Sequence, residues 1–174
     1  MSGKTIVQRT NLDGVLLITP PTVFEDFRGS FVEIYNEILY KEAGIDVNFV
    51  QDDVSTSRQH VLRGIHGDRQ TYKMVSCLYG ALYLVVANCD ENSQAFGKWF
   101  STTLSAANKR QVLVPPNHGL AHLVTTDVAL FHYKQSTYYD RASQFTYRWD
   151  DPRFGIDWPI EDPILSERDA RAEN

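Results

Sequence analysis

Residues 61–89 read V-L-R-G-I-H-G-D-R-Q-T-Y-K-M-V-S-C-L-Y-G-A-L-Y-L-V-V-A-N-C and contain three short apolar runs, 61–66, 72–79 and 81–89. Similar runs, rich in Val, Ile, Phe, Tyr and Thr, recur along the chain and are separated by Gly, Pro, Asn and Asp. They cover 15–19, 30–36, 48–57, 98–105, 110–115, 121–126 and 129–139. Short strands at this spacing predict an all-β sandwich or barrel.

Helices have a small part in this prediction. N-E-I-L-Y-K-E-A-G, residues 36–44, predicts a short helix with Asn36 as its cap and Gly44 as its stop, and a second helical turn is predicted to begin at Ser166. The chain has neither βαβ spacings nor a G-x-G-x-x-G element, so a Rossmann half is not supported. Antiparallel strands then close their edges by sheet packing, and we expect a cupin-type jelly-roll β-sandwich with short peripheral helices.

Length and charge limit the class of protein. The chain has 174 residues, enough for one domain, 1–174, to bury its core without disulfides or metal. Its net charge of −5 argues against nucleic acid and anionic membrane as partners. Cys77 and Cys89 are predicted to be buried free thiols. The sequence has no signal peptide and no apolar run of membrane-spanning length, so a cytoplasmic protein is expected.

A group of reactive side chains stands out against the apolar runs. Arg63, His66 and Lys73 occur in strand-like surroundings, Tyr133 lies in F-H-Y-K, and Asp169 ends P-I-L-S-E-R-D. Together they suggest a ligand site for proton transfer. Taken singly, each has an ordinary alternative: a core tyrosine, a solvated acid, or an exposed cation.

Several sequence blocks carry a family resemblance. They are F-E-D-F-R-G-S-F-V-E, F-V-Q-D-D-V-S-T-S, V-L-R-G-I-H, V-P-P-N-H-G-L-A-H, F-H-Y-K, R-W-D-D-P-R-F-G-I-D-W-P and I-L-S-E-R-D. In this order the blocks resemble the nucleotide-sugar 3,5-epimerases typified by dTDP-4-dehydrorhamnose 3,5-epimerase. The resemblance implies the same jelly roll, as a homodimer that exchanges N-terminal strands, and a reaction that needs neither metal nor cofactor.

The resemblance also implies roles in an epimerisation beside a ketone. A histidine titrates near neutral pH and can act as the base, and this is His66. Asp169 would accept a hydrogen bond from the other ring nitrogen of His66. Tyr133 would be the acid on the opposite face, a role that suits a phenol whose surroundings lower its pKa. Lys73 would stabilise the enolate oxygen.

Substrate contacts follow from the resemblance as well. Arg63 and Arg28 match arginines that hold the diphosphate, where a guanidinium can bind phosphate oxygens bidentately. The remaining residues are predicted with the following places: Phe24, Phe31 and Glu33 contact the sugar or base, and Gln51 and Asp53 contact the nucleotide. His122 lies near the site, and Tyr138 stacks on the base.

A metal site is a weaker interpretation of the histidines. Metal cupins use an H-x-H pair, which this chain lacks. His118 and His122 are four residues apart, but P-P-N-H-G-L predicts a loop rather than the helix that would place both on one face. No metal is therefore expected.

Two departures leave the exact reaction open. Gly67 and Asp68 replace the aromatic and amide of the commonest motif, R-G-L-H-Y-Q, and P-P-N-H-G-L-A-H is longer than the usual P-P-G-F-A-H. This variant looks more like epimerases outside the rhamnose route, including those acting on GDP-linked 6-deoxyheptoses. The carrier could thus be dTDP, GDP or CDP, and inversion could affect C3 alone or C3 and C5. The leading hypothesis is an epimerase of a 4-keto-6-deoxy sugar for surface polysaccharide such as O-antigen. The alternatives are a 3,4-ketoisomerase and a non-catalytic nucleotide-sugar-binding jelly roll.

Overall fold

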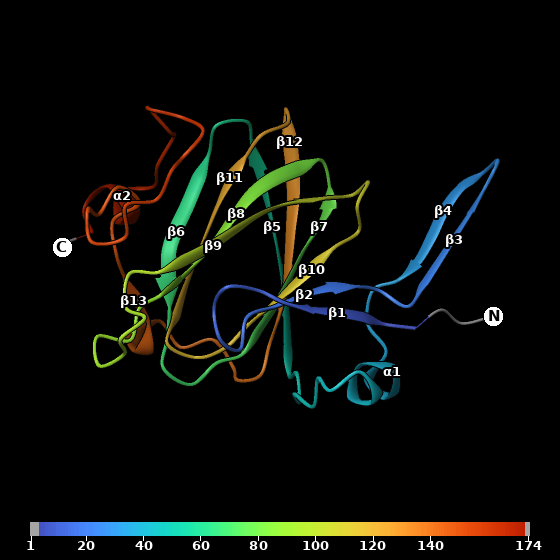
Figure 1. Ribbon diagram of the computed structural model, residues 1–174. Coiled ribbons are helices and arrows are strands. Elements are labelled where there is room, and N and C mark those ends of the chain that lie inside the picture. Colours follow the sequence, from blue (N-terminus) through green and yellow to red (C-terminus); the bar gives the residue numbers. More distant parts are fainter. Residues whose placement is uncertain (1–3, 173–174) are drawn as a thin grey trace.

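The computed structural model describes residues 4–172 and has two antiparallel β-sheets packed as a sandwich (Figure 1). One sheet has six strands, in the order β1 (Ile6–Arg9), β2 (Leu16–Thr19), β10 (Gln111–Val114), β7 (Lys73–Tyr79), β12 (Val128–Gln135) and β5 (Gln51–Arg58). The other has five, in the order β13 (Phe145–Thr146), β6 (Leu62–Gly67), β11 (His118–Val124), β8 (Ala81–Asn88) and β9 (Trp99–Ser105). The predicted jelly-roll fold class is confirmed.

The core explains why the central strands are apolar over most of their length. Alternate residues of β8, Leu82, Leu84 and Val86, are fully buried between the sheets against residues such as Val75 of β7. The other face of β8 is also covered, because Ala87 belongs to a second cluster built with the C-terminal segment, including Phe145, Tyr147, Phe154 and Trp158. This segment thus returns along the five-stranded sheet and brings the end of the chain close to β6 (Figure 1).

Both predicted helical turns are confirmed. Helix α1, Glu37–Glu42, begins after Asn36, whose side chain accepts a hydrogen bond from the backbone N–H of Leu39 at 3.3 Å. It packs Tyr40 into a cluster on the outside of the six-stranded sheet. Helix α2, Glu167–Ala170, begins after Ser166.

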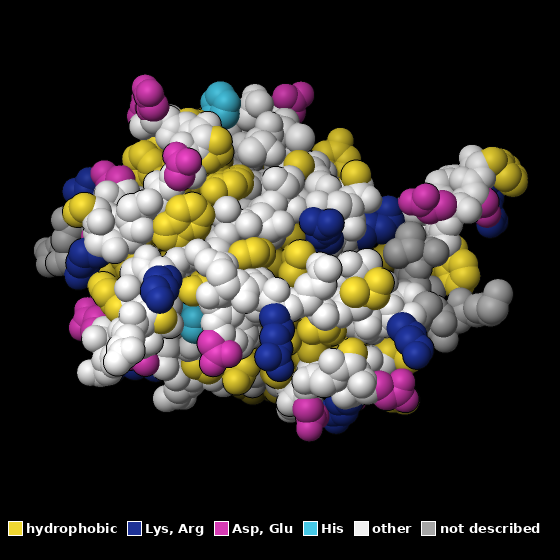
Figure 2. Space-filling model, viewed as in Figure 1, with side chains coloured by type: hydrophobic (Ala, Val, Ile, Leu, Met, Phe, Trp, Pro, Cys, Tyr) yellow, Lys and Arg dark blue, Asp and Glu magenta, His cyan; other side chains and the backbone are white. Residues whose placement is uncertain are grey.

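A two-stranded hairpin, β3 (Thr22–Asp26) and β4 (Gly29–Glu33), stands away from the sandwich (Figure 1). Figure 2 shows it clear of the body, with hydrophobic and charged side chains towards its tip. Phe24, Phe27 and Phe31 are 54%, 99% and 67% exposed. Large aromatic side chains exposed together in this way mark a surface that can contact another molecule.

The other expectations are mostly confirmed. Each of the ten predicted runs overlaps a strand, whereas β1, β3 and β13 were not predicted. The loop predicted over P-P-N-H-G-L is wrong from His118 onwards, because β11 already begins there. Cys77 and Cys89 are buried and free, as predicted. Within residues 4–172, none of the helices has the length and apolar character needed to span a bilayer.

Candidate active site

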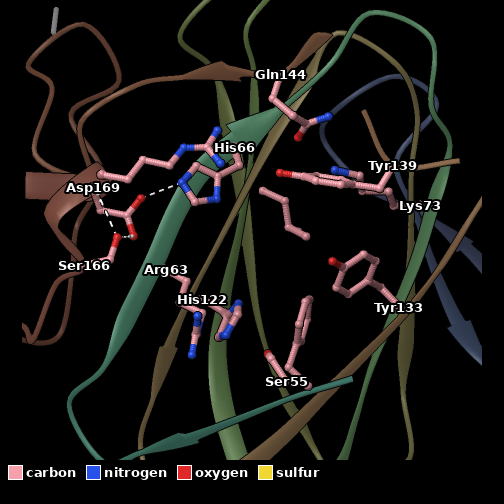
Figure 3. Close-up of a pocket in the computed structure, with 13 residues that line it drawn as sticks. Ser55, Arg63, His66, Lys73, His122, Tyr133, Tyr139, Gln144, Ser166 and Asp169 are labelled. Carbon is pink, nitrogen blue, oxygen red and sulfur yellow. Dashed lines mark hydrogen bonds and ion pairs between the residues drawn. The ribbon is translucent and has the colours of Figure 1, made fainter. Parts of the chain in front are cut away.

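A cavity of about 320 Å³ opens at one end of the sandwich and collects the reactive side chains predicted from the sequence (Figure 3). Six of its lining residues were predicted as site residues: Arg63, His66, Lys73, His122, Tyr133 and Asp169. The others are Ser55, Leu120, Phe131, Tyr139, Gln144, Ser166 and Arg168.

His66 and Asp169 form a hydrogen-bonded pair. The Nε2 atom of His66 lies 2.5 Å from Oδ1 of Asp169, whose side chain is 2% exposed. Ser166, the cap of α2, donates its hydroxyl to Oδ2 of Asp169 at 2.9 Å. Burial raises the pKa of the Asp169 carboxyl, but the contacts with His66, Ser166 and Arg168 outweigh burial and leave that pKa below its usual value. The carboxylate is therefore ionised at neutral pH and orients the imidazole, whose other nitrogen faces the cavity (Figure 3).

A β-bulge in β6 brings Arg63 and His66 to the same cavity. Residues three apart on a regular strand point to opposite faces. Here Arg63 pairs with His122, whereas His66 pairs with Leu120, so β6 uses one residue more than β11 over this stretch. The bulge contains Gly64, with φ of +121°, where a Cβ atom would come within 2.5 Å of the Ala121 side chain. Only glycine fits at this position.

Lys73 and Tyr133 come from the other sheet. Lys73 begins β7 and is 8% exposed, and its ammonium group has no hydrogen-bond partner among residues 4–172. Burial lowers the pKa of Lys73, partly opposed by the charges of Asp68 and Asp53. Tyr133 lies on β12, across the cavity from His66 (Figure 3).

The environment of Tyr133 differs from the expectation. Burial raises the pKa of its phenol, and Asp53 and Tyr139 raise it further, whereas Arg63 lowers it. The surroundings that would lower the pKa of this phenol are therefore not those that the structure gives Tyr133. Tyr133 is held in its protonated form, the state in which a phenol can donate a proton.

His122 is a neutral, buried wall of the cavity. Its ring stacks on Phe131 with centroids 4.1 Å apart. Burial, followed by the nearby Arg63 and His66, lowers the pKa of His122 to about 3. Its Nε2 atom is buried and has no hydrogen-bond partner in the described part of the chain, so it is available to a ligand. Arg63 is fixed beside it by a 3.0 Å hydrogen bond from Nε to the Ser57 hydroxyl.

The other predicted contact residues lie outside the cavity lining. Phe24, Arg28, Phe31 and Glu33 belong to the projecting hairpin, and Arg28 is paired with Asp26 at 2.6 Å. None of these four residues is among those that line the cavity of the same chain.

Gln51 and Asp53 bind other parts of the protein. Asp53 accepts hydrogen bonds from the side chains of Gln51 and Gln135, at 2.8 and 2.9 Å. Gln51 in turn accepts one from the backbone N–H of Tyr139 at 2.9 Å. It is Tyr139 that lines the cavity, whereas its neighbour Tyr138 is 77% exposed.

The lining residues that sequence reasoning missed had different signals. Ser166 and Arg168 lie in the quoted block I-L-S-E-R-D, beside Asp169. Gln144 lies in a connection before the two-residue strand β13, where no motif marks it.

His118 and His122 both lie on β11, and within residues 4–172 no three His, Cys, Asp or Glu side chains are grouped to hold a metal.

Comparisons with known proteins show a family that matches nearly the whole chain. The family model described as dTDP-4-dehydrorhamnose 3,5-epimerase matches residues 9–174. The dTDP-4-dehydrorhamnose 3,5-epimerase of Escherichia coli K12 is 41% identical over 170 residues, which cover 95% of this chain and 91% of the relative.

Two solved structures are similar over most of the chain. The dTDP-6-deoxy-D-glucose-3,5-epimerase of Legionella pneumophila, in complex with dTDP-4-keto-L-rhamnose, has a TM-score of 0.90 and 36% identity, covering 97% of this chain and 91% of that one. A 3'-monoepimerase from Streptomyces bikiniensis, in complex with dTDP-quinovose, has a TM-score of 0.86 and 30% identity, covering 94% and 84%.

Proposed function

This chain belongs to the dTDP-4-dehydrorhamnose 3,5-epimerase family, and from that membership we propose that it inverts C3 and C5 of a dTDP-linked 4-keto-6-deoxy sugar. The observation that carries the proposal is a histidine–aspartate pair on one side of the cavity facing a protonated tyrosine on the other. Inversion beside a ketone needs this arrangement, since a proton leaves from one face of the ring and another arrives at the opposite face.

His66 acts as the base in this mechanism. Asp169 accepts the hydrogen bond from Nε2, so the neutral imidazole presents its free nitrogen to the ligand. When that nitrogen takes the proton from carbon, the imidazolium is stabilised by the buried carboxylate beside it. Positioned bases of this kind contribute roughly 10²–10⁴ in rate.

Lys73 and Tyr133 complete the reaction. The charge left on carbon moves to the ketone oxygen, and the ammonium of Lys73, which has no hydrogen-bond partner among the described residues, can bind this enolate oxygen. Tyr133 then donates its proton to the carbon from the opposite face. Before the next inversion, the His66 imidazolium loses its extra proton to solvent and the Tyr133 tyrosinate takes one up from solvent.

The cations near the cavity fit an anionic diphosphate. Arg63 and Arg168 line it on the side of β6 and α2, and each carries a guanidinium that can bind two phosphate oxygens. The free Nε2 of His122 adds an acceptor or donor at the cavity wall. The dTDP carrier is supported by the ligand of the Legionella relative, which is a dTDP sugar.

The exposed hairpin supports a homodimer. Phe24 on β3 and Phe31 on β4 are more than half exposed, and Arg28 and Glu33 lie on the same hairpin. We propose that the hairpin crosses to a second copy and brings these side chains to the mouth of the partner's cavity, beside the partner's exposed Tyr138. Sedimentation of wild type and of Phe24→Ser/Phe31→Ser tests this: a dimer is expected for the first and a weakened dimer for the second. A monomeric wild type would contradict the proposal.

The reaction is placed in the cytoplasm as part of this proposal, where free thiols such as Cys77 and Cys89 persist. Its product would feed a bacterial surface polysaccharide such as O-antigen. A 3,4-ketoisomerase shares the enediol intermediate but moves the carbonyl, and a binding jelly roll would do no chemistry.

Proton NMR in D₂O tests these possibilities together. The protein is incubated with 4-keto-6-deoxy sugars carried on dTDP, CDP or GDP, and loss of the C3 and C5 signals is followed. Loss at both carbons with the dTDP sugar, together with an inverted product, is expected. Loss at C3 alone would make the chain a monoepimerase, a migrated carbonyl would make it a ketoisomerase, and binding without loss of either signal would refute the catalytic proposal.

A further inference from the structure

Asp68 is a buried carboxylate just outside the cavity lining, at a position where the chain departs from the commonest motif. It follows β6 directly and is 4% exposed. Its Oδ1 atom accepts the backbone N–H groups of Gln70 and Thr71, at 2.9 and 2.6 Å. Its Oδ2 atom accepts the side-chain N–H of Gln144 at 2.9 Å. One carboxylate therefore fixes both the short loop before Lys73 and a side chain of the cavity.

The contact with Asp68 decides which end of the Gln144 amide faces the ligand. A carboxylate only accepts hydrogen bonds, so Gln144 must turn its nitrogen towards Asp68. Its carbonyl oxygen then points into the cavity on the side of His66 (Figure 3). This end of the cavity consequently offers an acceptor, which suits a hydroxyl group of the substrate.

The same carboxylate acts on Lys73. The charged groups that face Lys73 are Asp68 after β6, Asp53 on β5 and Arg168 on α2, and the titratable side chains of His66, Tyr133 and Tyr139 share its cavity. Asp68 is the first of these in raising the pKa of Lys73 against the effect of burial. The backbone and Gln144 hydrogen bonds outweigh burial and keep the pKa of Asp68 itself below its usual value, so the negative charge is present at neutral pH.

We propose that Asp68 is a positioning residue with two effects: it orients the Gln144 amide as an acceptor for a sugar hydroxyl, and it places a negative charge at the capped loop that leads to Lys73. The proposal rests on the proposed epimerase function for its kinetic consequences. The hydrogen-bond polarity and the charge next to Lys73 are properties of the free protein and can be measured without substrate.

A reciprocal pair of substitutions tests this proposal. In Asp68→Asn the oxygen of the new amide can still accept the hydrogen bonds from the two backbone N–H groups, but the nitrogen of that amide now faces the side-chain nitrogen of Gln144. Gln144→Glu instead sets two carboxylates against each other. Each single variant is expected to lose roughly 10- to 100-fold in kcat/KM, the range of one or two misplaced hydrogen bonds to a charged group. The double variant restores one donor, one acceptor and one negative charge, so its kcat/KM should recover to within about fivefold of the wild-type value.

One measurement and one control variant separate positioning from loss of structure. In the free protein, the NMR titration of Lys73 should move to lower pH in Asp68→Asn and return towards the wild-type position in the double variant. Asp90→Asn is the matched control, since Asp90 also caps a turn, accepting the backbone N–H of Asn92 at 3.0 Å, but lies outside this cavity. It should change neither readout.

The outcomes are distinguishable from failure of the proposed function. If wild type exchanges no substrate proton, the function fails, while the Lys73 titrations still decide the role of Asp68. An unmoved titration in Asp68→Asn, or a folded double variant no better than the single variants, would overturn the positioning role.

Discussion

Replacing Asp169 by asparagine tests the most specific feature of the site. The asparagine side chain has nearly the same shape, and its oxygen can still accept the hydrogen bond from His66, so the ring stays in place. What is lost is the negative charge. With Nε2 and Oδ1 2.5 Å apart, the imidazolium and carboxylate charges lie about 4 Å from each other. At an effective dielectric constant of roughly 20 their attraction is about 4 kcal/mol.

That energy converts directly into an expected rate. At about 1.4 kcal/mol per factor of ten, complete loss of the attraction would slow proton removal by about 10³. The proton is only partly transferred in the transition state, so a loss of roughly 10²–10³ in kcat is expected, with a small change in KM. The assay is single-turnover exchange of the C3 and C5 protons in D₂O, followed by NMR at saturating substrate.

Two controls make this result interpretable. Ser166→Ala removes the 2.9 Å hydrogen bond to Oδ2 of Asp169 and the 3.2 Å cap that the Ser166 hydroxyl accepts from the backbone N–H of Asp169, and should cost about tenfold or less in kcat. Asp151→Asn alters another carboxylate of 2% exposure, paired with Arg153 and remote from the cavity, and should leave kcat unchanged. If Asp169→Asn kept more than a tenth of wild-type kcat, the carboxylate would not be stabilising the imidazolium and the dyad argument would be refuted.

Three further predictions concern the other walls of the cavity and its backbone. Tyr133→Phe should still exchange substrate protons but give no inverted product by NMR; normal inversion would identify another acid. His122 has a pKa of about 3 when folded and about 6.5 when unfolded, so the unfolded state binds the extra proton and stability falls as pH drops between these values. The free energy of unfolding, measured with denaturant, should therefore fall by about 2 kcal/mol less between pH 7.5 and 5.0 in His122→Phe than in wild type. Gly64→Ala should lower both the melting temperature and kcat, because its Cβ would meet Ala121 at 2.5 Å; an unchanged melting temperature would contradict the close approach.

The fold class was predictable because its signals are local. Strand-forming runs separated by turn residues gave ten of the strands, and the cap residues Asn36 and Ser166 gave both helical turns. The strands that were missed are those that such signals do not mark. Ile6–Arg9 is a short edge strand with two polar residues, Phe145–Thr146 has only two residues, and Thr22–Asp26 becomes a strand by pairing with Gly29–Glu33 in the hairpin.

The site was predictable only in part, since its geometry depends on long-range packing. His66 and Asp169 are 103 residues apart, and nothing local joins them; the family resemblance suggested the pair that the structure contains. Gln144 and Tyr139 reach the cavity through hydrogen bonds to Asp68 and Gln51, which no spacing in the sequence indicates. Tyr133 shows the limit most clearly, because the direction of its pKa shift depends on burial and on Asp53 across a strand pair.

The sandwich itself accounts for the stereochemistry that we propose. A sugar held through its diphosphate by Arg63 and Arg168 cannot turn its ring over between two proton transfers. A site with a base and an acid on one sheet would return the proton to the face it left, with no net change. Here His66 projects from β6 of the five-stranded sheet, whereas Tyr133 projects from β12 of the six-stranded sheet. Because the two sheets face each other, the two groups reach opposite faces of a ring bound between them, and inversion proceeds without release of the intermediate.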